Sequence, residues 1–111
     1  MGDRANIKLV DGDSTVFLYT HWDGSVLPGT LQRALAKKER WDDGQYLARI
    51  IFQEMLGTDE GTTGYGISSI VGDGDDRILT VDISGQTVSA RDAKWSFSDY
   101  LNIDASTVWG I

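Results

Sequence analysis

The chain has 111 residues, a length typical of one domain with one hydrophobic core, so we expect a single domain over residues 1–111. Hydrophobic residues make up 41% and charged residues 24%, and no apolar run approaches the roughly 20 residues that span a bilayer. The absence of cysteine excludes disulfides and thiol nucleophiles, and a net charge of −7 argues against binding to the phosphate backbone of nucleic acids.

The N-terminal segment is predicted to form a β-hairpin. Residues 6–10 and 15–19 are rich in strand-forming residues, and residues 11–14 between them have the aspartates and glycine of a tight turn. The hairpin leads into residues 21–24 (His-Trp-Asp-Gly), which contain the only histidine of the chain. This junction between a β-rich opening and a helical middle is the first place to look for a functional centre.

A first helix is predicted after the junction. Ser25 is a suitable N-cap, and Pro28 fits the first helical turn, where its missing N–H is harmless. Four apolar residues at helical spacing mark one face: Leu27, Leu31, Ala34 and Leu35. Lys37, Lys38 and Arg40 are expected in the last turn, where cations interact favourably with the helix dipole.

A second helix is predicted to begin at a cap on Asp42 or Asp43 and to end at Gly57. Its apolar stripe, which we expect to cover the sheet, consists of Tyr46, Leu47, Ile50, Ile51 and Met55. Phe52 lies off this stripe, so it is expected to pack against a different neighbour.

The C-terminal half is predicted to be mainly strands, over residues 65–71, 78–83 and 86–90. Residues 95–101 have the patterns of both a strand and a short helix, and the apolar tail at residues 102–111 is expected to dock on the body of the protein. The order β-β-α-α-β-β-β predicts an α+β fold, a mainly antiparallel sheet of about five strands with two helices on one face.

His21 and Asp23 are the first candidates for chemistry. If the segment is extended, both side chains project to the same side, and Asp23 could fix the tautomer of a catalytic His21. No Gly-x-Ser-x-Gly motif places a nucleophile beside them. The alternative, which we favour, is that both side chains bond to the backbone at the junction and orient Trp22.

Aromatic residues at the ends of elements are the second candidates: Tyr19, Trp22, Trp41, Tyr65 and Trp95. With Arg4 or Arg49 to counter an anion, such rings could stack a nucleobase and hold its phosphate, or they could simply close the ends of a small core. Gly64 and Gly66 around Tyr65 indicate a bend in the chain, or a place where a ligand or another backbone segment comes close. The predicted ligand-binding residues are His21, Trp22, Asp23, Arg49, Tyr65 and Gly66.

No metal or cofactor site is predicted. The acidic turns at residues 11–13 and 73–76 lack the remaining ligands of a calcium loop, and the glycine-rich residues 61–66 lack the lysine and the following helix of a P-loop.

Four segments together resemble a family of small, uncharacterised proteins from bacteria, their phages and mobile elements. They are residues 2–7 (GDRANI), 19–24 (YTHWDG), 40–52 (RWDD-x2-YLARIIF) and 64–68 (GYGIS), and the resemblance extends over about residues 2–83. It implies a context, a small cytoplasmic accessory protein encoded by a phage or prophage. Proteins of that class often act stoichiometrically, by binding a host or defence component or by sequestering a signalling nucleotide.

The leading hypothesis is therefore a cytoplasmic binding protein whose partner is a small anionic ligand or a host or defence protein. We favour this hypothesis over an enzyme. The first alternative is a small hydrolase or transferase with His21 as general acid or base and Asp23 orienting it. The second is a protein inhibitor whose acidic surface competes with nucleic acid for a basic partner. Membrane binding is not expected, and the sequence leaves the oligomeric state open.

Overall fold

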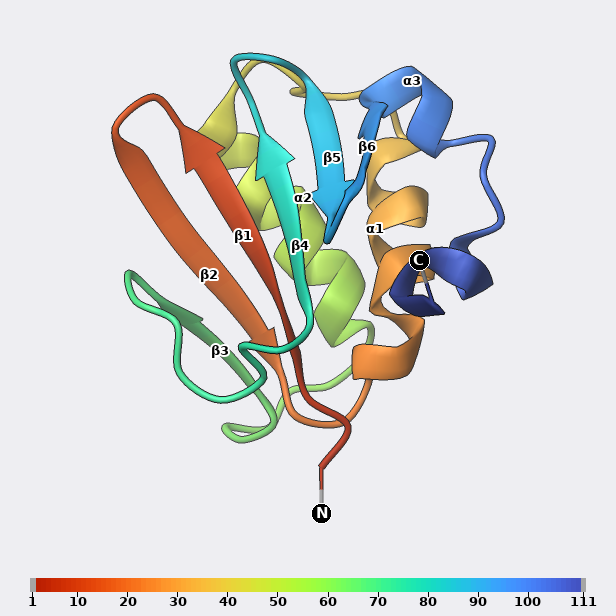
Figure 1. The fold of residues 1–111 in the computed structure, drawn as a ribbon. Helices are drawn as coiled ribbons and strands as arrows, with labels where there is room; N and C mark the ends of the chain where they lie inside the picture. Colours follow the sequence, from red (N-terminus) through yellow and green to blue (C-terminus); the bar gives the residue numbers. More distant parts are fainter. Residues whose placement is uncertain (1, 111) are drawn as a thin grey trace.

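Residues 2–110 are described in the computed structural model, in which two helices pack on one face of a six-stranded sheet (Figure 1). The strands lie in the order β3-β2-β1-β4-β5-β6. Their bounds are β1 (Ala5–Asp11), β2 (Ser14–Thr20), β3 (Tyr65–Ser68), β4 (Ile78–Asp82), β5 (Thr87–Ala90) and β6 (Ala93–Ser96). The helices are η1 (Gly24–Val26), α1 (Leu27–Leu35), α2 (Gly44–Leu56), α3 (Phe97–Tyr100) and η2 (Ala105–Gly110). The predicted α+β class is confirmed, with six strands rather than the expected five.

The β1–β2 hairpin forms as predicted, with Ala5 paired to Thr20 and Asp11 paired to Ser14. β1 also pairs with β4 in parallel, and the other pairings in the sheet are antiparallel. A parallel pair needs a crossover connection, and the chain supplies one through α1, α2 and β3. The two central strands are therefore far apart in sequence, and β3 is left at one edge of the sheet.

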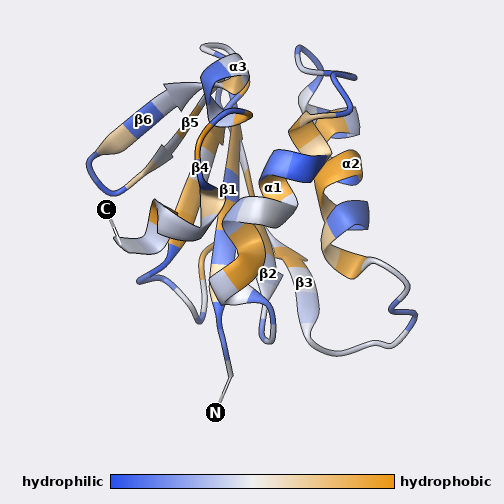
Figure 2. Cartoon of the chain, turned by 90° about the vertical axis from the view of Figure 1, so that its right-hand side faces the viewer, coloured by the Kyte–Doolittle hydropathy of each residue, from blue (hydrophilic) through white to orange (hydrophobic). Residues whose placement is uncertain are grey.

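The core lies between the sheet and the two long helices, where hydrophobic residues gather in Figure 2. All four apolar residues of the predicted α1 face are buried, as are Leu47, Ile51 and Met55 on α2. They pack against sheet residues that point to the helix side: Ile7, Leu9, Leu18, Leu79, Val81 and Val88. Burial of each large aliphatic side chain contributes about 1.5–3 kcal/mol, so this layer carries most of the stability.

The start and end of α1 differ from the prediction. Ser25 lies in η1 and does not cap α1, because its N–H and hydroxyl both donate to the carboxylate of Asp3. The helix ends at Leu35, so Lys37, Lys38 and Arg40 follow it instead of forming its last turn. Lys38 and Arg40 have positive φ angles of 54° and 60°, which turn the chain toward α2.

The ends of α2 agree with the prediction, but its apolar stripe is narrower. Asp43 accepts a hydrogen bond from the N–H of Tyr46, and Gly57 ends the helix with a φ of 58°. Tyr46 does not join the core: it is exposed, with the guanidinium of Arg40 over its ring. Phe52 packs at the margin of the core, on the side of α2 that faces β2 and β3.

The C-terminal part contains both structures that its sequence pattern allowed. Residues 93–96 form β6, and α3 follows directly with Ser96 as its cap. The predicted strand at residues 65–71 is shorter, because β3 ends at Ser68. The tail docks as expected over residues 102–110, with Val108 buried and the indole of Trp109 donating to the carbonyl of Gly24 over 2.7 Å. Ile111 lies outside the described residues.

No helix within residues 2–110 has the length and apolar character needed to cross a membrane.

Candidate functional site

The main chain of the junction after β2 is fixed from both sides. The N–H of His21 donates to the carbonyl of Gly64 over 2.8 Å, and the carbonyl of His21 accepts from the N–H of Asp3 over 2.7 Å. The hydroxyl of Thr20 accepts hydrogen bonds from the N–H groups of Trp22 and Asp23. The junction is therefore a rigid part of the fold, joined to the N-terminal segment and to the loop before β3.

Asp23, Tyr65 and Trp22 close the junction with their side chains. The hydroxyl of Tyr65 donates to the carboxylate of Asp23, and this hydrogen bond, with burial, raises the pKa of Tyr65 to about 12. The Trp22 ring stands edge-on against the Tyr65 ring, with centroids 5.7 Å apart. Gly64 has a φ of +89°, and a side chain there would overlap the Trp22 ring. The loop before β3 thus packs against this side of the junction, while the Trp22 side chain stays partly exposed.

His21 is bonded to Tyr19 and Arg4 rather than to Asp23. Its Nδ1 lies 2.9 Å from the hydroxyl of Tyr19 and 3.3 Å from the Nε of Arg4. An arginine only donates, so Nδ1 accepts this bond and the ring carries its proton on Nε2. The His21–Asp23 pair that an extended segment would allow is not formed, because Asp23 turns into η1 with a φ of −118° and a ψ of 24°. The favoured alternative is also wrong, since within the described residues both side chains bond to other side chains and not to the backbone. The carboxylate that would orient a catalytic histidine is held by Tyr65.

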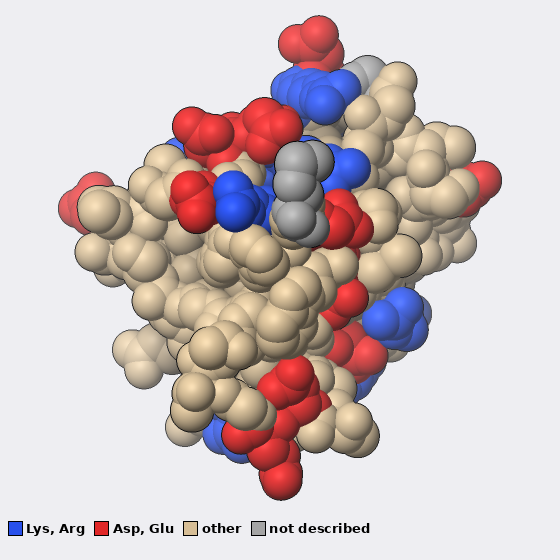
Figure 3. All heavy atoms as spheres, turned by 90° about the horizontal axis from the view of Figure 1, so that it is seen from below, with Lys and Arg blue, Asp and Glu red and all other residues tan. Residues whose placement is uncertain are grey.

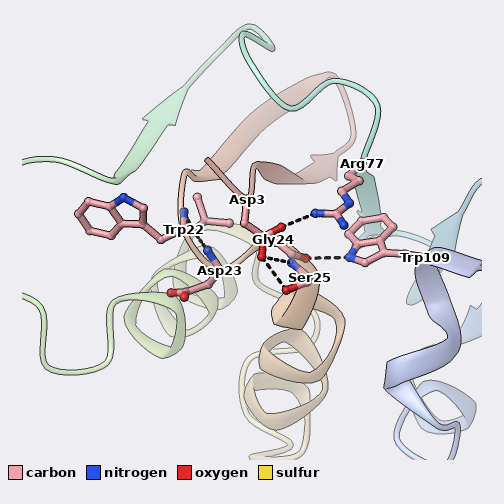
Figure 4. A network of polar contacts seen from close by, with 8 residues as sticks. Asp3, Trp22, Asp23, Gly24, Ser25, Arg77 and Trp109 are labelled. Atoms are coloured by element: carbon pink, nitrogen blue, oxygen red, sulfur yellow. Dashed lines mark hydrogen bonds and ion pairs between the residues drawn. The ribbon is translucent and has the colours of Figure 1, made fainter. Parts of the chain in front are cut away.

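A polar network behind the junction ties the N-terminal segment to the tail (Figure 4). The carboxylate of Asp3 accepts from Ser25 and forms an ion pair with Arg77, and these bonds lower the pKa of Asp3. The guanidinium of Arg77 in turn lies over the Trp109 ring, 5.8 Å from its centroid. No local sequence pattern indicates this network, because Asp3 and Arg77, which form its ion pair, are 74 residues apart.

The other predicted binding residues lie elsewhere or contribute only backbone. Gly66 pairs with Tyr19 inside the sheet. Arg49 is on α2 and lines a groove that contains none of the other five predicted residues. Two of the candidate aromatic residues lie far from the junction: Trp41 packs on Phe97, and Trp95 packs on Tyr100. Those two rings pack against the core, as in the alternative interpretation that the aromatic residues close the ends of a small core.

Two apolar hollows flank β3. A groove of about 680 Å³ separates α2 from β2 and β3, and a second hollow of about 320 Å³ lies on the other face of β3. Ile67 lines both of them and is 61% exposed, and Ile70, in the second hollow, is 72% exposed. We call this region the β3 edge surface and define it by Phe52, Leu56, Ile67 and Ile70. Of these four residues, the sequence pattern singled out only Phe52, which lies off the apolar stripe of α2.

Charged side chains lie at the margins of this surface. The α2-side groove is lined by Asp59, Glu60 and Arg49, and the second hollow by Asp73. In Figure 3, which views the lower end of the molecule, acidic side chains form separate clusters around a broad area without charges. Among the residues that line the two hollows, Asp59, Glu60 and Asp73 outnumber Arg49, so the margins of the apolar surface are mainly acidic.

No family model, curated protein or solved structure matches the chain. Within residues 2–110, no group of three or more histidine or carboxylate side chains is arranged to hold a metal ion.

Proposed function

We propose that the protein is a stoichiometric binding protein that engages a partner protein through the β3 edge surface. The observation that carries this proposal is the exposure of Ile67 and Ile70 beside two apolar hollows at an open edge of the sheet. Folded proteins usually protect such edges, and contiguous exposed apolar surface marks interaction sites.

The contacts of the junction favour a protein partner over a small anionic ligand. Asp23, Tyr65 and Trp22 are engaged with one another, and the nearest cation to His21, Arg4, is hydrogen-bonded to it. Arg49 lies on the groove side of α2 instead. In the context that the motif resemblance implies, the partner is a host or defence component of a bacterial cell, and the protein acts in the cytoplasm.

Site-specific photo-crosslinking in bacterial cells tests this proposal. A photoreactive amino acid replaces Ile70 on the β3 edge surface or, as a control, Asp13 in the exposed turn of the hairpin. We expect a discrete protein adduct from position 70 only, and we expect Ile67→Thr in the same chain to reduce it. Identical adducts from both positions, or none from position 70, would overturn the proposal. Calorimetric titration with cyclic and linear nucleotides tests the alternative that the protein binds a small anionic ligand. We expect no heat of binding with any of them.

A further inference from the structure

The backbone of β3 has free hydrogen-bonding groups on its outer side. The N–H of His21 bonds to the carbonyl of Gly64, which makes this a hydrogen-bonded pair of the antiparallel ladder. Because such pairs alternate with non-bonded ones, Tyr19–Gly66 is also a bonded pair, and the N–H and C=O groups of Tyr65 and Ile67 point away from β2. Within residues 2–110, no hydrogen bond to these outward groups is found outside the strand ladder.

The two faces of β3 offer space for the side chains of a further strand. Successive side chains of an added strand would point alternately toward the α2-side groove and toward the second hollow. The groove presents Phe52, Leu56 and Ile67, and the hollow presents Phe17 and Ile70. Both faces are apolar, so the complementary segment is apolar on both of its faces, with its larger side chains in the larger groove.

The charges at the margins determine which segment fits. Asp59 and Glu60 on one side of β3, and Asp73 on the other, outnumber the single cation Arg49 among the residues lining the two hollows. No ion pair holds Asp59 or Glu60 within the described part of the chain. A second copy of this chain would bring another net charge of −7 to the same edge, which disfavours self-association. Lysine and arginine beside an apolar core are complementary to this edge.

We propose that the partner binds by strand addition: an extended segment of the partner protein, with an apolar core flanked by lysine or arginine, pairs with the outer edge of β3. This inference rests on the proposed function, since it names the chemistry of the partner at the same surface. Main-chain hydrogen bonds to Tyr65 and Ile67 hold the segment, the two hollows take its side chains, and the acidic margins select its charge.

Synthetic peptides test the charge selection. The probe is a short peptide with a β-branched apolar core flanked by lysines, compared with the same core flanked by glutamates. By fluorescence anisotropy at low salt, we expect the lysine peptide to bind about tenfold or more tightly than the glutamate peptide. The double variant Asp59→Asn with Glu60→Gln should reduce this difference several-fold, while Val26→Thr, at another exposed apolar residue, leaves it unchanged. Equal affinity of the two peptides would overturn the proposed partner chemistry.

Backbone methylation tests the pairing itself. Two lysine-flanked peptides carry N-methyl groups at alternate positions, so that only one of them keeps the N–H groups facing β3. We expect only that one to bind and to slow the hydrogen exchange of the Tyr65 and Ile67 amides. Equal binding of both, or no protection at these amides, would exclude strand addition. If crosslinking from position 70 succeeds while these peptides fail, the binding role stands and strand addition falls; if both fail, both fall.

Discussion

The closed junction and the β3 edge surface are neighbours in the fold but differ in what their groups are bonded to. At the junction, polar side chains meet: Asp23 holds Tyr65, and Tyr19 and Arg4 hold His21. At the edge, Ile67 and Ile70 are exposed aliphatic side chains, and the outward backbone groups of β3 have no ladder partner. Residues with rich chemistry can be fully used by the fold, whereas plain aliphatic residues can be left free for a partner. The predictions below separate these two situations.

The largest effect is expected from Gly64→Ala at the junction. Alanine must adopt the φ of +89° and its side chain would displace the Trp22 ring from Tyr65, which should cost about 2–3 kcal/mol of unfolding free energy. The matched control is Gly66→Ala, where the added carbon meets nothing within 4 Å and the effect should stay within about 0.5 kcal/mol. Urea denaturation measures both, and equal midpoints would show that the junction is not closed by this loop.

A smaller loss is expected from Tyr65→Phe, which removes the hydrogen bond to Asp23 but keeps the ring against Trp22. Because the acceptor is charged but partly solvated, we expect about 1 kcal/mol lower stability at pH 7. Urea denaturation with Tyr46→Phe as a control, at an exposed tyrosine, should show no comparable change. A variant as stable as wild type would mean that this bond contributes nothing.

The same pair of proteins should converge at alkaline pH. The pKa of Tyr65 is raised from 10.0 to about 12 in the folded state, so its contribution is complete below pH 10 and is lost as the pH rises through 12. The difference between wild type and Tyr65→Phe should therefore narrow over this range. Burial also raises the pKa of Tyr100, but that residue is present in both proteins and cancels in the comparison. A constant difference up to pH 12 would contradict the assignment.

A still smaller loss of stability is expected for Asp3→Asn, which weakens the network between the N-terminal segment and the tail. Hydrogen bonds from Ser25 and the Arg77 ion pair lower the pKa of Asp3 below 3.8, so its contribution is present above that pH and is lost as the pH falls through the folded value. We expect a deficit of about 0.5–1 kcal/mol at pH 7 that shrinks as the pH falls through the folded pKa of Asp3. Asp13→Asn, in the exposed hairpin turn, is the control, and a deficit independent of pH would refute this origin.

Local patterns predicted the parts of the fold that depend on neighbouring residues. The spacing of Leu27, Leu31 and Leu35 predicted the buried face of α1, and a cap at Asp42 or Asp43 predicted the start of α2. The parallel β1–β4 pair and the Asp3–Arg77 contact could not be predicted in this way, because they depend on how distant segments meet.

The candidate site was predictable only in part. His21, Trp22, Asp23 and Tyr65 do gather at one place, yet Asp23 turns into η1 and bonds to Tyr65 instead of His21. Arg49 lines the groove because the position of α2 against the sheet is set by packing and not by charge. The openness of a surface depends on which neighbours are absent, and a linear pattern contains no such information.

The smallest effect on stability is expected at the β3 edge surface, from Ile67→Thr. Threonine keeps the β-branched shape that suits a strand, and the 61% exposed side chain loses little burial, so the unfolding free energy should change by no more than about 0.5 kcal/mol. Binding of the lysine-flanked peptide should nevertheless weaken several-fold, because its apolar core loses contact with a side chain that lines the α2-side groove. Val26→Thr, which is 58% exposed on η1, should change neither quantity. Denaturation and anisotropy on the same samples measure both effects. A variant that loses stability instead of binding would mean that Ile67 supports the fold, and the contrast between the closed junction and the open edge would then be lost.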